Sequence, residues 1–214
     1  MKNERILIAD DQSVVRQGVE RVNETFGATS GWLGDARPTR KMKISPEYEG
    51  AILTTTYVAG TDTSTTGNMI SDTATGSATL QNYYQWTRTQ STMHFYTVAV
   101  KVELPEDFSD WTTSPDAAVV DYVTQENTTT NNLLDVYVYR DDSTASPVVF
   151  STNNKSATAA TWTTINFTKS QLDDGVGVDW DTAGQEVVFY FRMGSQSNKY
   201  VRIGDITLSY LSKF

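Results

Sequence analysis

The chain has 214 residues, no Cys, one His and a formal net charge of −9. The lack of Cys excludes disulfide scaffolds, thiolate metal sites and thiol catalysis, and a single His, His94, leaves little for a catalytic triad or a His-rich metal centre. The length predicts one large domain, or one domain with an arm. The 32 Thr residues favour strands, because β-branched side chains pack well on a pleated surface.

Charge divides the chain into two parts. Residues 1–43 carry 8 Lys/Arg and 6 Asp/Glu, and residues 44–214 carry 9 and 20, so the net charges are +2 and −11. A body this acidic should repel nucleic acid and anionic membranes, and we expect neither as a partner. No apolar run approaches the ~18 residues of a membrane helix. The apolar residues 6–9 are too few for a signal peptide, which predicts synthesis in the cytoplasm.

The first part is expected to be an N-terminal arm with a short strand and one helix. After a strand at residues 5–9, Asp10 or Asp11 can cap a helix over about residues 12–26, which Gly27 ends. The apolar residues of this helix are spaced 4, 3 and 4 apart and share one face. They are Val15, Val19, Val22 and Phe26. Since such a helix is marginal alone, this face should pack against another surface.

The rest of the arm, residues 27–40, is expected to be an irregular linker that ends in a basic cluster. We expect the apolar face of the helix, two linker side chains and the basic cluster to bind a partner subunit, since an apolar stripe without a core of its own must be buried somewhere. The predicted partner-binding residues are Val15, Val19, Val22, Phe26, Trp32, Leu33, Arg37, Arg40, Lys41 and Lys43.

From residue 41 onward, apolar and polar residues alternate with a period of two, as in strands with one buried face. The clearest case is residues 92–104, where Val98, Val100 and Val102 face one way. The expected strands are residues 41–44, 50–58, 80–87, 92–104, 117–125, 133–140, 147–151, 161–167, 186–193 and 200–211. About ten strands without a convincing helix predict an all-β, antiparallel β-sandwich over residues 44–214.

Three segments of the body carry more specific expectations. Residues 186–193 are apolar on both faces, which predicts a central strand. Residues 200–211 change face at Gly204-Asp205, where a β-bulge would restore the core register. The Thr/Ser/Gly-rich residues 59–78 are expected to form a mobile loop.

An acidic turn is the candidate metal site. Clustered carboxylates can bind Ca²⁺, which takes six to eight oxygen ligands. The spacing is not that of an EF-hand, and a solvated acidic turn is the alternative. We therefore expect no cofactor, with Ca²⁺ as the alternative at Asp173, Asp174, Asp179 and Asp181.

Aromatic residues are the candidate glycan site. Coplanar exposed rings could stack on sugar rings, whereas most aromatic side chains in a sandwich fill its core or cover its ends. The residues singled out for stacking are Tyr83, Tyr84 and Trp180.

The sequence predicts a protein that is not an enzyme. It contains no G-x-S-x-G, P-loop or H-E-x-x-H string. His94 is expected at the start of a strand as a partly exposed surface group. A glycoside hydrolase or lyase on the same fold would need two carboxylates roughly 5–10 Å apart in a cleft, and such a pair cannot be picked from 26 scattered acids.

The N-terminal string RILIADD, residues 5–11, with VVRQG, residues 14–18, resembles the opening of a response-regulator receiver domain. In that family the acidic pair helps to hold Mg²⁺ beside a phospho-accepting Asp. The resemblance ends at about residue 19, because Thr-rich β structure follows where the family has βα alternation. A short strand followed by a helix cap is the preferred interpretation.

The body resembles the jelly-roll modules of virion proteins from tailed bacteriophages. The strings that carry this resemblance are ISPEYEGAIL at 44–53, NYYQWT at 82–87, VELPEDFSDW at 102–111 and RIGDITLSYL at 202–211. The resemblance implies a jelly-roll β-sandwich of about 8–10 strands in a capsid decoration, minor capsid or head-fibre protein, with a structural role.

The function predicted from the sequence is therefore that of a non-enzymatic virion protein, made in the host cytoplasm. Its arm would dock on the major capsid protein or other virion subunits, and its acidic sandwich would be exposed. A homo-oligomer such as a trimer is consistent with this role. The alternative is a carbohydrate-binding module, and the two ideas merge if a virion surface domain binds host glycans.

Overall fold

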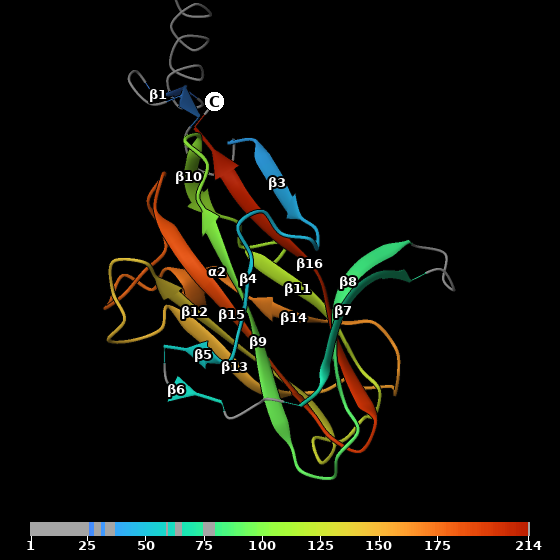
Figure 1. The fold of residues 1–214 in the computed structure, drawn as a ribbon. Coiled ribbons are helices and arrows are strands. Elements are labelled where there is room, and N and C mark those ends of the chain that lie inside the picture. The colour runs from blue at the N-terminus through green and yellow to red at the C-terminus, as the bar shows by residue number, and fades with distance from the viewer. Residues whose placement is uncertain are drawn as a thin grey trace, which may run out of the picture.

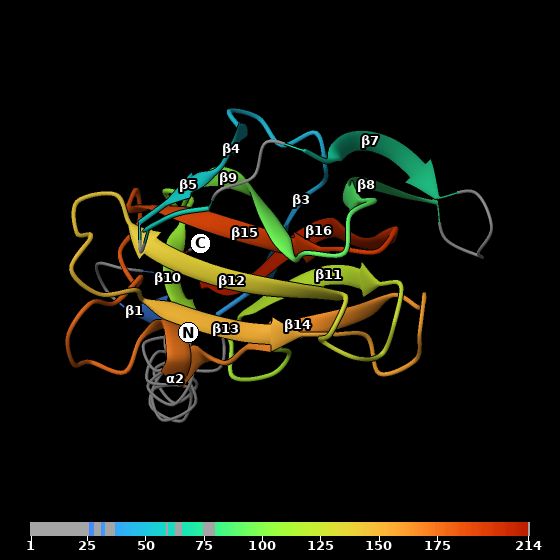
Figure 2. The ribbon, with the colours of Figure 1, turned by 60° about the horizontal axis from the view of Figure 1, so that its bottom comes forward.

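The computed structural model describes residues 26–27, 31–32, 37–58, 60–62, 66–74 and 80–213. Two antiparallel sheets pack face to face and form a sandwich (Figure 1 and Figure 2). The alternation of apolar and polar residues explains this architecture, because each sheet turns its apolar side chains inward.

The first sheet has the strand order β14-β11-β16-β8-β7. Its long strand β16 also pairs with β10 and β3 over its C-terminal half. The strands are β3 (Thr39–Ile44), β7 (Asn68–Ala74), β8 (Gln81–Arg88), β10 (Phe108–Trp111), β11 (Ala118–Thr124), β14 (Thr163–Phe167) and β16 (Lys199–Ser212).

The second sheet has the order β13-β12-β15-β9-β4. Its strands are β4 (Ile52–Thr54), β9 (His94–Glu103), β12 (Asn132–Arg140), β13 (Val149–Asn154) and β15 (Glu186–Ser195). Two small strand pairs and one helical turn complete the described elements. They are β1 (Phe26–Gly27) with β2 (Gly31–Trp32), β5 (Thr56–Tyr57) with β6 (Gly60–Thr61), and α2 (Lys169–Leu172).

The connections are those of a jelly roll. Apart from the short β10, the chain from β8 to β16 crosses to the other sheet at every step except the β12–β13 hairpin. The result is two four-stranded sets, β8-β16-β11-β14 and β9-β15-β12-β13, as expected for a double-sheet jelly roll. The predicted fold class is confirmed.

The core lies between the sheets and follows the predicted alternation. Val98, Val100 and Val102 of β9 are buried against Phe189 and Phe191 of the neighbouring β15. Strand β15 pairs with β12 on one side and β9 on the other, so the predicted central strand is confirmed.

The predicted bulge in the last strand is confirmed as well. Val120 pairs with Ile206 and Tyr122 pairs with Ile203, so the single Asp121 faces the two residues Gly204 and Asp205. The extra residue restores the inward direction of the apolar side chains after the bulge.

The predicted mobile loop over residues 59–78 is wrong in part. Residues 68–74 form strand β7, which pairs with β8 along its whole length and forms a ribbon that projects from the sandwich (Figure 1 and Figure 2). The sequence of β7, NMISDTA, places Met69 and Ile70 next to each other and has no clean apolar alternation, and β7 was therefore not expected. Strand β10 was not expected either.

The N-terminal region is described only in part. Of the helix expected over residues 12–26, only Phe26 is among the described residues, and it lies in β1 and not in a helix. The predicted boundary at residue 43 falls inside β3, so that residues 39–43 belong to a sandwich sheet. In the part of the chain that the structure describes, no helix is long and apolar enough to cross a membrane.

Candidate functional site

One outer sheet face carries a continuous row of apolar side chains. In register across the second sheet, Phe150 of β13 pairs with Tyr137, Tyr137 with Tyr190, Tyr190 with Ala99, and Ala99 with Ile52 of β4. Alternation turns Tyr137, Tyr190 and Ala99 away from the core, because their neighbours along the strand are buried, and Phe150 and Ile52 pair in register with them. We call these five residues, three aromatic and two aliphatic, the aromatic row. With strands about 4.8 Å apart, the row extends about 19 Å across the sheet.

The row is open to solvent at both ends and covered to different degrees in between, because Ala99 is buried, with 9% exposure. Phe150 is 58% exposed and Ile52 is 63% exposed, whereas Tyr137 and Tyr190 are half-buried. The rings of Phe150 and Tyr137 are nearly parallel, with an angle of 19° and centroids 6.3 Å apart. Tyr190 is braced by Tyr139, whose ring meets it nearly edge-on at 6.2 Å. Rings held in this way keep their orientation before a ligand arrives.

A polar row runs beside the aromatic row and consists of Asp135, Arg192, Thr97 and Thr54, which pair in register across the sheet. Its central residue is Arg192, which donates from Nε and Nη2 to Asp62, at 2.8 and 2.6 Å, and from Nη1 to Asp135, at 2.8 Å. The guanidinium also lies over the Phe95 ring, 3.4 Å from its centroid. Burial opposes the charge of Arg192, but the hydrogen bonds that Arg192 donates to Asp62 and Asp135, with the negative charge of Asp62, outweigh burial and raise the pKa of this guanidinium.

The β5–β6 hairpin is fixed onto this face. The Tyr57 ring lies 5.5 Å from the Tyr137 ring, and the Arg192 guanidinium lies 5.1 Å from the Tyr57 centroid. The backbone N–H of Asp62, just after β6, donates to the carbonyl of Thr55 at 2.7 Å. The hairpin therefore adds an aromatic ring and a carboxylate to the face.

The three aromatic residues singled out from the sequence do not form a platform. Trp180 has no exposed surface and packs in the core against Trp111 and Phe189, so it is excluded as a stacking residue. Tyr83, on the first sheet, is 5% exposed, and Arg202 and Trp162 lie against its ring. Tyr84 is partly buried and packs against the core. All three were selected because they are aromatic, and residue type alone does not indicate whether neighbouring side chains cover a ring.

The residues that sequence reasoning missed have a recognisable signal. Tyr137 and Tyr139 alternate with buried Val136 and Val138 along β12, so their outward direction follows from the period of two. The positions of Phe150 and Tyr190 beside Tyr137 depend on strand pairing, which the sequence does not specify.

The acidic turn brings three of its four predicted carboxylates together. One oxygen each of Asp173, Asp179 and Asp181 lies within 4.8 Å of the other two. Asp174 is used locally, because its Oδ1 accepts from the backbone N–H of Val176 at 2.8 Å. Burial, followed by repulsion from Asp181, raises the pKa of Asp173. Three carboxylates suit a hard cation but supply fewer than the six to eight oxygens of Ca²⁺, so Ca²⁺ stays a prediction.

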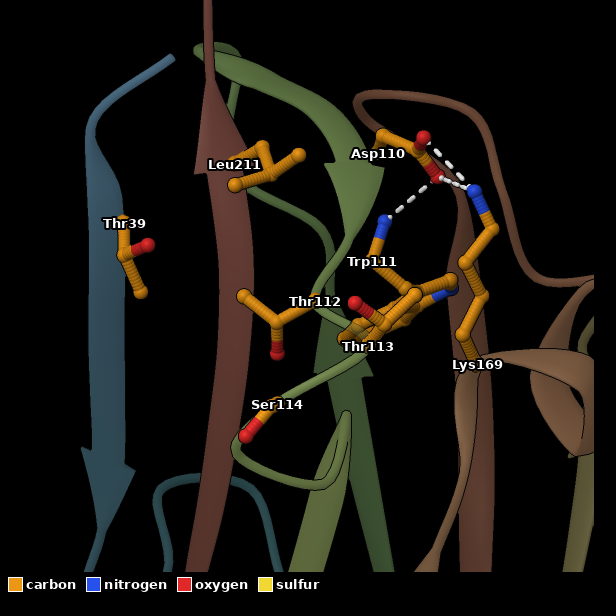
Figure 3. Close-up of a pocket in the computed structure, with 8 residues that line it drawn as sticks. All are labelled: Thr39, Asp110, Trp111, Thr112, Thr113, Ser114, Lys169 and Leu211. Atoms are coloured by element: carbon orange, nitrogen blue, oxygen red, sulfur yellow. Dashed lines mark hydrogen bonds and ion pairs between the residues drawn. The ribbon is translucent and has the colours of Figure 1, made fainter. Parts of the chain in front are cut away.

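A pocket of about 350 Å³ lies at one end of the sandwich (Figure 3). Lys169 Nζ bonds both carboxylate oxygens of Asp110, at 2.6 and 2.7 Å, and Asp110 also accepts from the backbone N–H of Trp111. The other polar groups on its wall include the hydroxyls of Thr113 and Ser114. The Trp111 ring is fully buried, so the pocket offers no aromatic surface for stacking.

His94 lies at the start of β9 and is partly exposed, in the position expected for it. Burial, reinforced by the nearby Arg88 charge, lowers the pKa of His94.

The predicted docking residues are only partly described. Val15, Val19, Val22 and Leu33 lie outside the described residues, and for Phe26 and Trp32 only the backbone is described, as the β1–β2 pair. Docking on a virion subunit therefore stays a prediction.

Three of the four basic residues contact the sandwich itself. Arg37 donates to Ser109 at 2.5 Å, Arg40 lies 3.1 Å from Asp107, and Lys43 lies 2.6 Å from Asp205. Lys41 is exposed.

Comparison with known proteins gave only distant structural likenesses. No protein-family model and no curated protein matches the sequence. Among solved structures, the carbohydrate-binding module TmCBM61 in complex with β-1,4-galactotriose has 8% identity and a TM-score of 0.35, with 82% of this chain and 89% of that chain covered. The xylan-binding module CBM86 from Roseburia intestinalis has 12% identity and a TM-score of 0.37, with 79% and 94% covered.

A phage protein is also among the similar structures. The enzymatically active domain of bacteriophage CBA120 tailspike protein 4 has 8% identity and a TM-score of 0.39, with 75% of this chain but only 19% of that chain covered. At such TM-scores, none of these likenesses assigns a ligand or an activity to the chain.

Proposed function

We propose that the protein is a carbohydrate-binding domain that holds a glycan chain along its aromatic row. The observation that carries this proposal is the register of Phe150, Tyr137 and Tyr190, three rings side by side on one solvent-facing sheet surface. Such rings provide large, rigid apolar surfaces on which the C–H faces of sugars can stack.

The polar groups around the row suit the same ligand. Tyr137 and Tyr190 each combine an apolar ring with a hydroxyl that can bond a sugar hydroxyl. Ligand sites commonly pair apolar and aromatic surfaces with a few fixed polar groups. A row of about 19 Å across the strands fits a chain of several sugar units better than a single sugar.

The sandwich suits a role in binding because it provides a rigid support for the rings. The rings stand on β12, β13 and β15, whose inner faces form the buried core, so the binding surface is rigid. A rigid, preformed surface loses little conformational entropy when a ligand binds.

The proposal is tested by electrophoresis in gels that contain β-1,4-galactan, xylan or mixed-linkage β-glucan. The protein should be retarded by at least one polysaccharide. Tyr137→Ala and Tyr190→Ala should each weaken binding by about tenfold, since losing an aromatic contact of about 1.5 kcal/mol corresponds to that factor.

The matched control is Tyr200→Ala, which removes a half-buried ring from the outer face of the other sheet. It should leave retardation unchanged, and thermal unfolding should show that all three variants are folded. No retardation of the parent protein on any of the gels would contradict the proposal, and so would retardation of Tyr137→Ala and Tyr190→Ala equal to that of the parent.

A further inference from the structure

We infer that this face selects uncharged glycans and rejects acidic ones, such as uronate-rich or sulfated chains. The inference rests on the proposed function and adds the substrate class. Its basis is that the cations on the two sides of the aromatic row, Arg192 and Lys101, are each bound by carboxylates of the protein itself.

Arg192 is the cation on one side of the aromatic row. It is two residues from Tyr190 on β15 and therefore faces the same way. Both oxygens of Asp62 and one oxygen of Asp135 accept its N–H groups, and its side chain is only 16% exposed. A sugar carboxylate would have to displace a bidentate pair that is already formed, which is costly for a partly desolvated guanidinium.

Lys101 is the cation on the other side. It is two residues from Ala99 on β9 and pairs across the sheet with Val188 of β15. Its Nζ lies 2.5 Å from Glu186 and 3.2 Å from Asp141. The hydrogen bonds that Lys101 donates to these two carboxylates, first of all to Glu186, raise the pKa of Lys101.

The sum of these charges disfavours an anion. Two cations face four carboxylates, Asp62, Asp135, Asp141 and Glu186, so the net charge of these ion-pair groups is −2. An acidic sugar on the aromatic row would meet no uncompensated cation among them and would be repelled by the excess carboxylates. A neutral sugar has no such Coulomb penalty, and its contacts with the rings do not depend on charge.

The opposite sheet face shows what a different charge arrangement looks like. Arg202 lies between the rings of Tyr83 and Tyr200, and its Nε donates to the amide oxygen of Gln85. In the described part of the chain, no ion pair is found between Arg202 and a carboxylate. Arg202 therefore differs from Arg192 and Lys101, although other cations of the first sheet, such as Lys43 with Asp205, are paired with carboxylates as well.

The test compares a neutral polysaccharide that retards the protein with the carboxymethyl derivative of the same polysaccharide. Binding to the neutral polymer should change less than twofold between 20 and 500 mM NaCl, because only charge interactions are screened by salt. At 20 mM NaCl, the carboxymethyl polymer should bind at least about tenfold more weakly, a difference of 1.4 kcal/mol.

A charge variant sharpens this test. The double variant D141N/E186Q leaves Lys101 without its carboxylates while keeping the shape of both side chains. It should bind the carboxymethyl polymer several-fold more tightly at 20 mM NaCl and the neutral polymer within twofold of the parent, with an unchanged melting temperature as the check on folding. Unchanged binding of the carboxymethyl polymer by this variant would count against the inference.

The outcomes separate the inference from the proposed function. Retardation by a neutral polymer together with equal or tighter binding of its carboxymethyl derivative would overturn the inference alone. Retardation by no neutral polymer would overturn the proposed function, and the inference with it.

Discussion

Each of the two sheets carries an Arg among aromatic rings on its outer face, but the two faces are built differently. On the second sheet, Arg192 is bound by Asp62 and Asp135, and the rings of the aromatic row stay accessible beside it. On the first sheet, Arg202 lies 4.2 Å from the centroid of the Tyr83 ring and Trp162 packs nearby, which leaves Tyr83 with 5% exposure.

An aromatic residue on an outer face is therefore not by itself a binding residue. What decides is whether neighbouring side chains cover the ring. Carboxylates hold Arg192 within the polar row, whereas Arg202 has ring faces as its main partners and closes over them. The outer face of the first sheet is therefore covered around Tyr83, whereas that of the second sheet is open around Phe150. The two Arg residues can be used to test this distinction.

The largest effect should come from Arg192→Met. This change leaves Asp62 and Asp135 without their cation, and their side chains are only 10% and 6% exposed. Removing one partner from a buried ion pair typically costs about 3–5 kcal/mol, and we expect a loss of that size in the free energy of unfolding, measured with urea.

The matched variant is Arg202→Met, which removes ring contacts and one hydrogen bond but leaves no carboxylate unpaired. Its expected cost is about 1 kcal/mol, the range of a cation–π contact. If the two variants lose the same stability, the two faces do not differ in the way described.

A smaller loss is expected from Gly204→Ala at the bulge of the first sheet. An added Cβ would lie 2.4 Å from Gln81 Nε2, 2.9 Å from the Trp162 ring and 3.2 Å from Asp121 Cβ. Because these groups close over the glycine, we expect the variant to lose about 1–3 kcal/mol of unfolding free energy, as for other overpacked sites.

Gly175→Ala is not a suitable control for this change, because Gly175 has a φ of 74°. Thr207→Ala in the same strand is a better one, since it adds no atoms to the covered face. A Gly204→Ala protein as stable as the parent would show that Trp162 and Gln81 do not pack over the bulge.

The fold could be predicted from the sequence because periodicity reports burial directly. Nine of the ten expected segments coincide with single strands, and the expected strand over 50–58 is split into β4 and β5. The face change at Gly204-Asp205 was visible for the same reason, as a break in alternation. Strand β7 was missed because its apolar residues do not alternate, and β10 was missed because four residues are too few to show a period.

The site was harder to predict because it depends on which strands are neighbours. Tyr137 and Phe150 lie in adjacent strands of the chain, but Tyr190 comes from β15, more than 35 residues further along the sequence, and meets Tyr137 only through strand pairing. Trp180 was chosen for its type, and its burial is a property of the core around it. Composition gives the kinds of side chain available, and topology decides which of them share a surface.

The smallest expected effect is the pH dependence of stability at Asp121, which tests whether the outer face of the first sheet is covered. Burial raises the pKa of Asp121, although a hydrogen bond from Gln81 acts in the opposite direction. A carboxyl with a raised folded-state pKa favours folding when protonated, so its contribution to stability decreases as pH rises from its ordinary value of 3.8 through the folded-state value. Asp121→Asn should therefore gain stability relative to the parent at pH 7, and the gain should shrink as pH falls below 3.8.

Asp142→Asn, in the turn after β12 of the second sheet, supplies a control of opposite sign for this last experiment. The hydrogen bond from Arg140 lowers the pKa of Asp142, so this carboxyl stabilises the fold when ionised and loses that contribution at acid pH. Urea unfolding at pH 7 and pH 3.5 should give Asp121→Asn and Asp142→Asn stability differences that change with pH in opposite directions. A pH-independent difference for Asp121→Asn would mean that Asp121 is solvated, and that the first face is more open than its covered aromatic residues indicate.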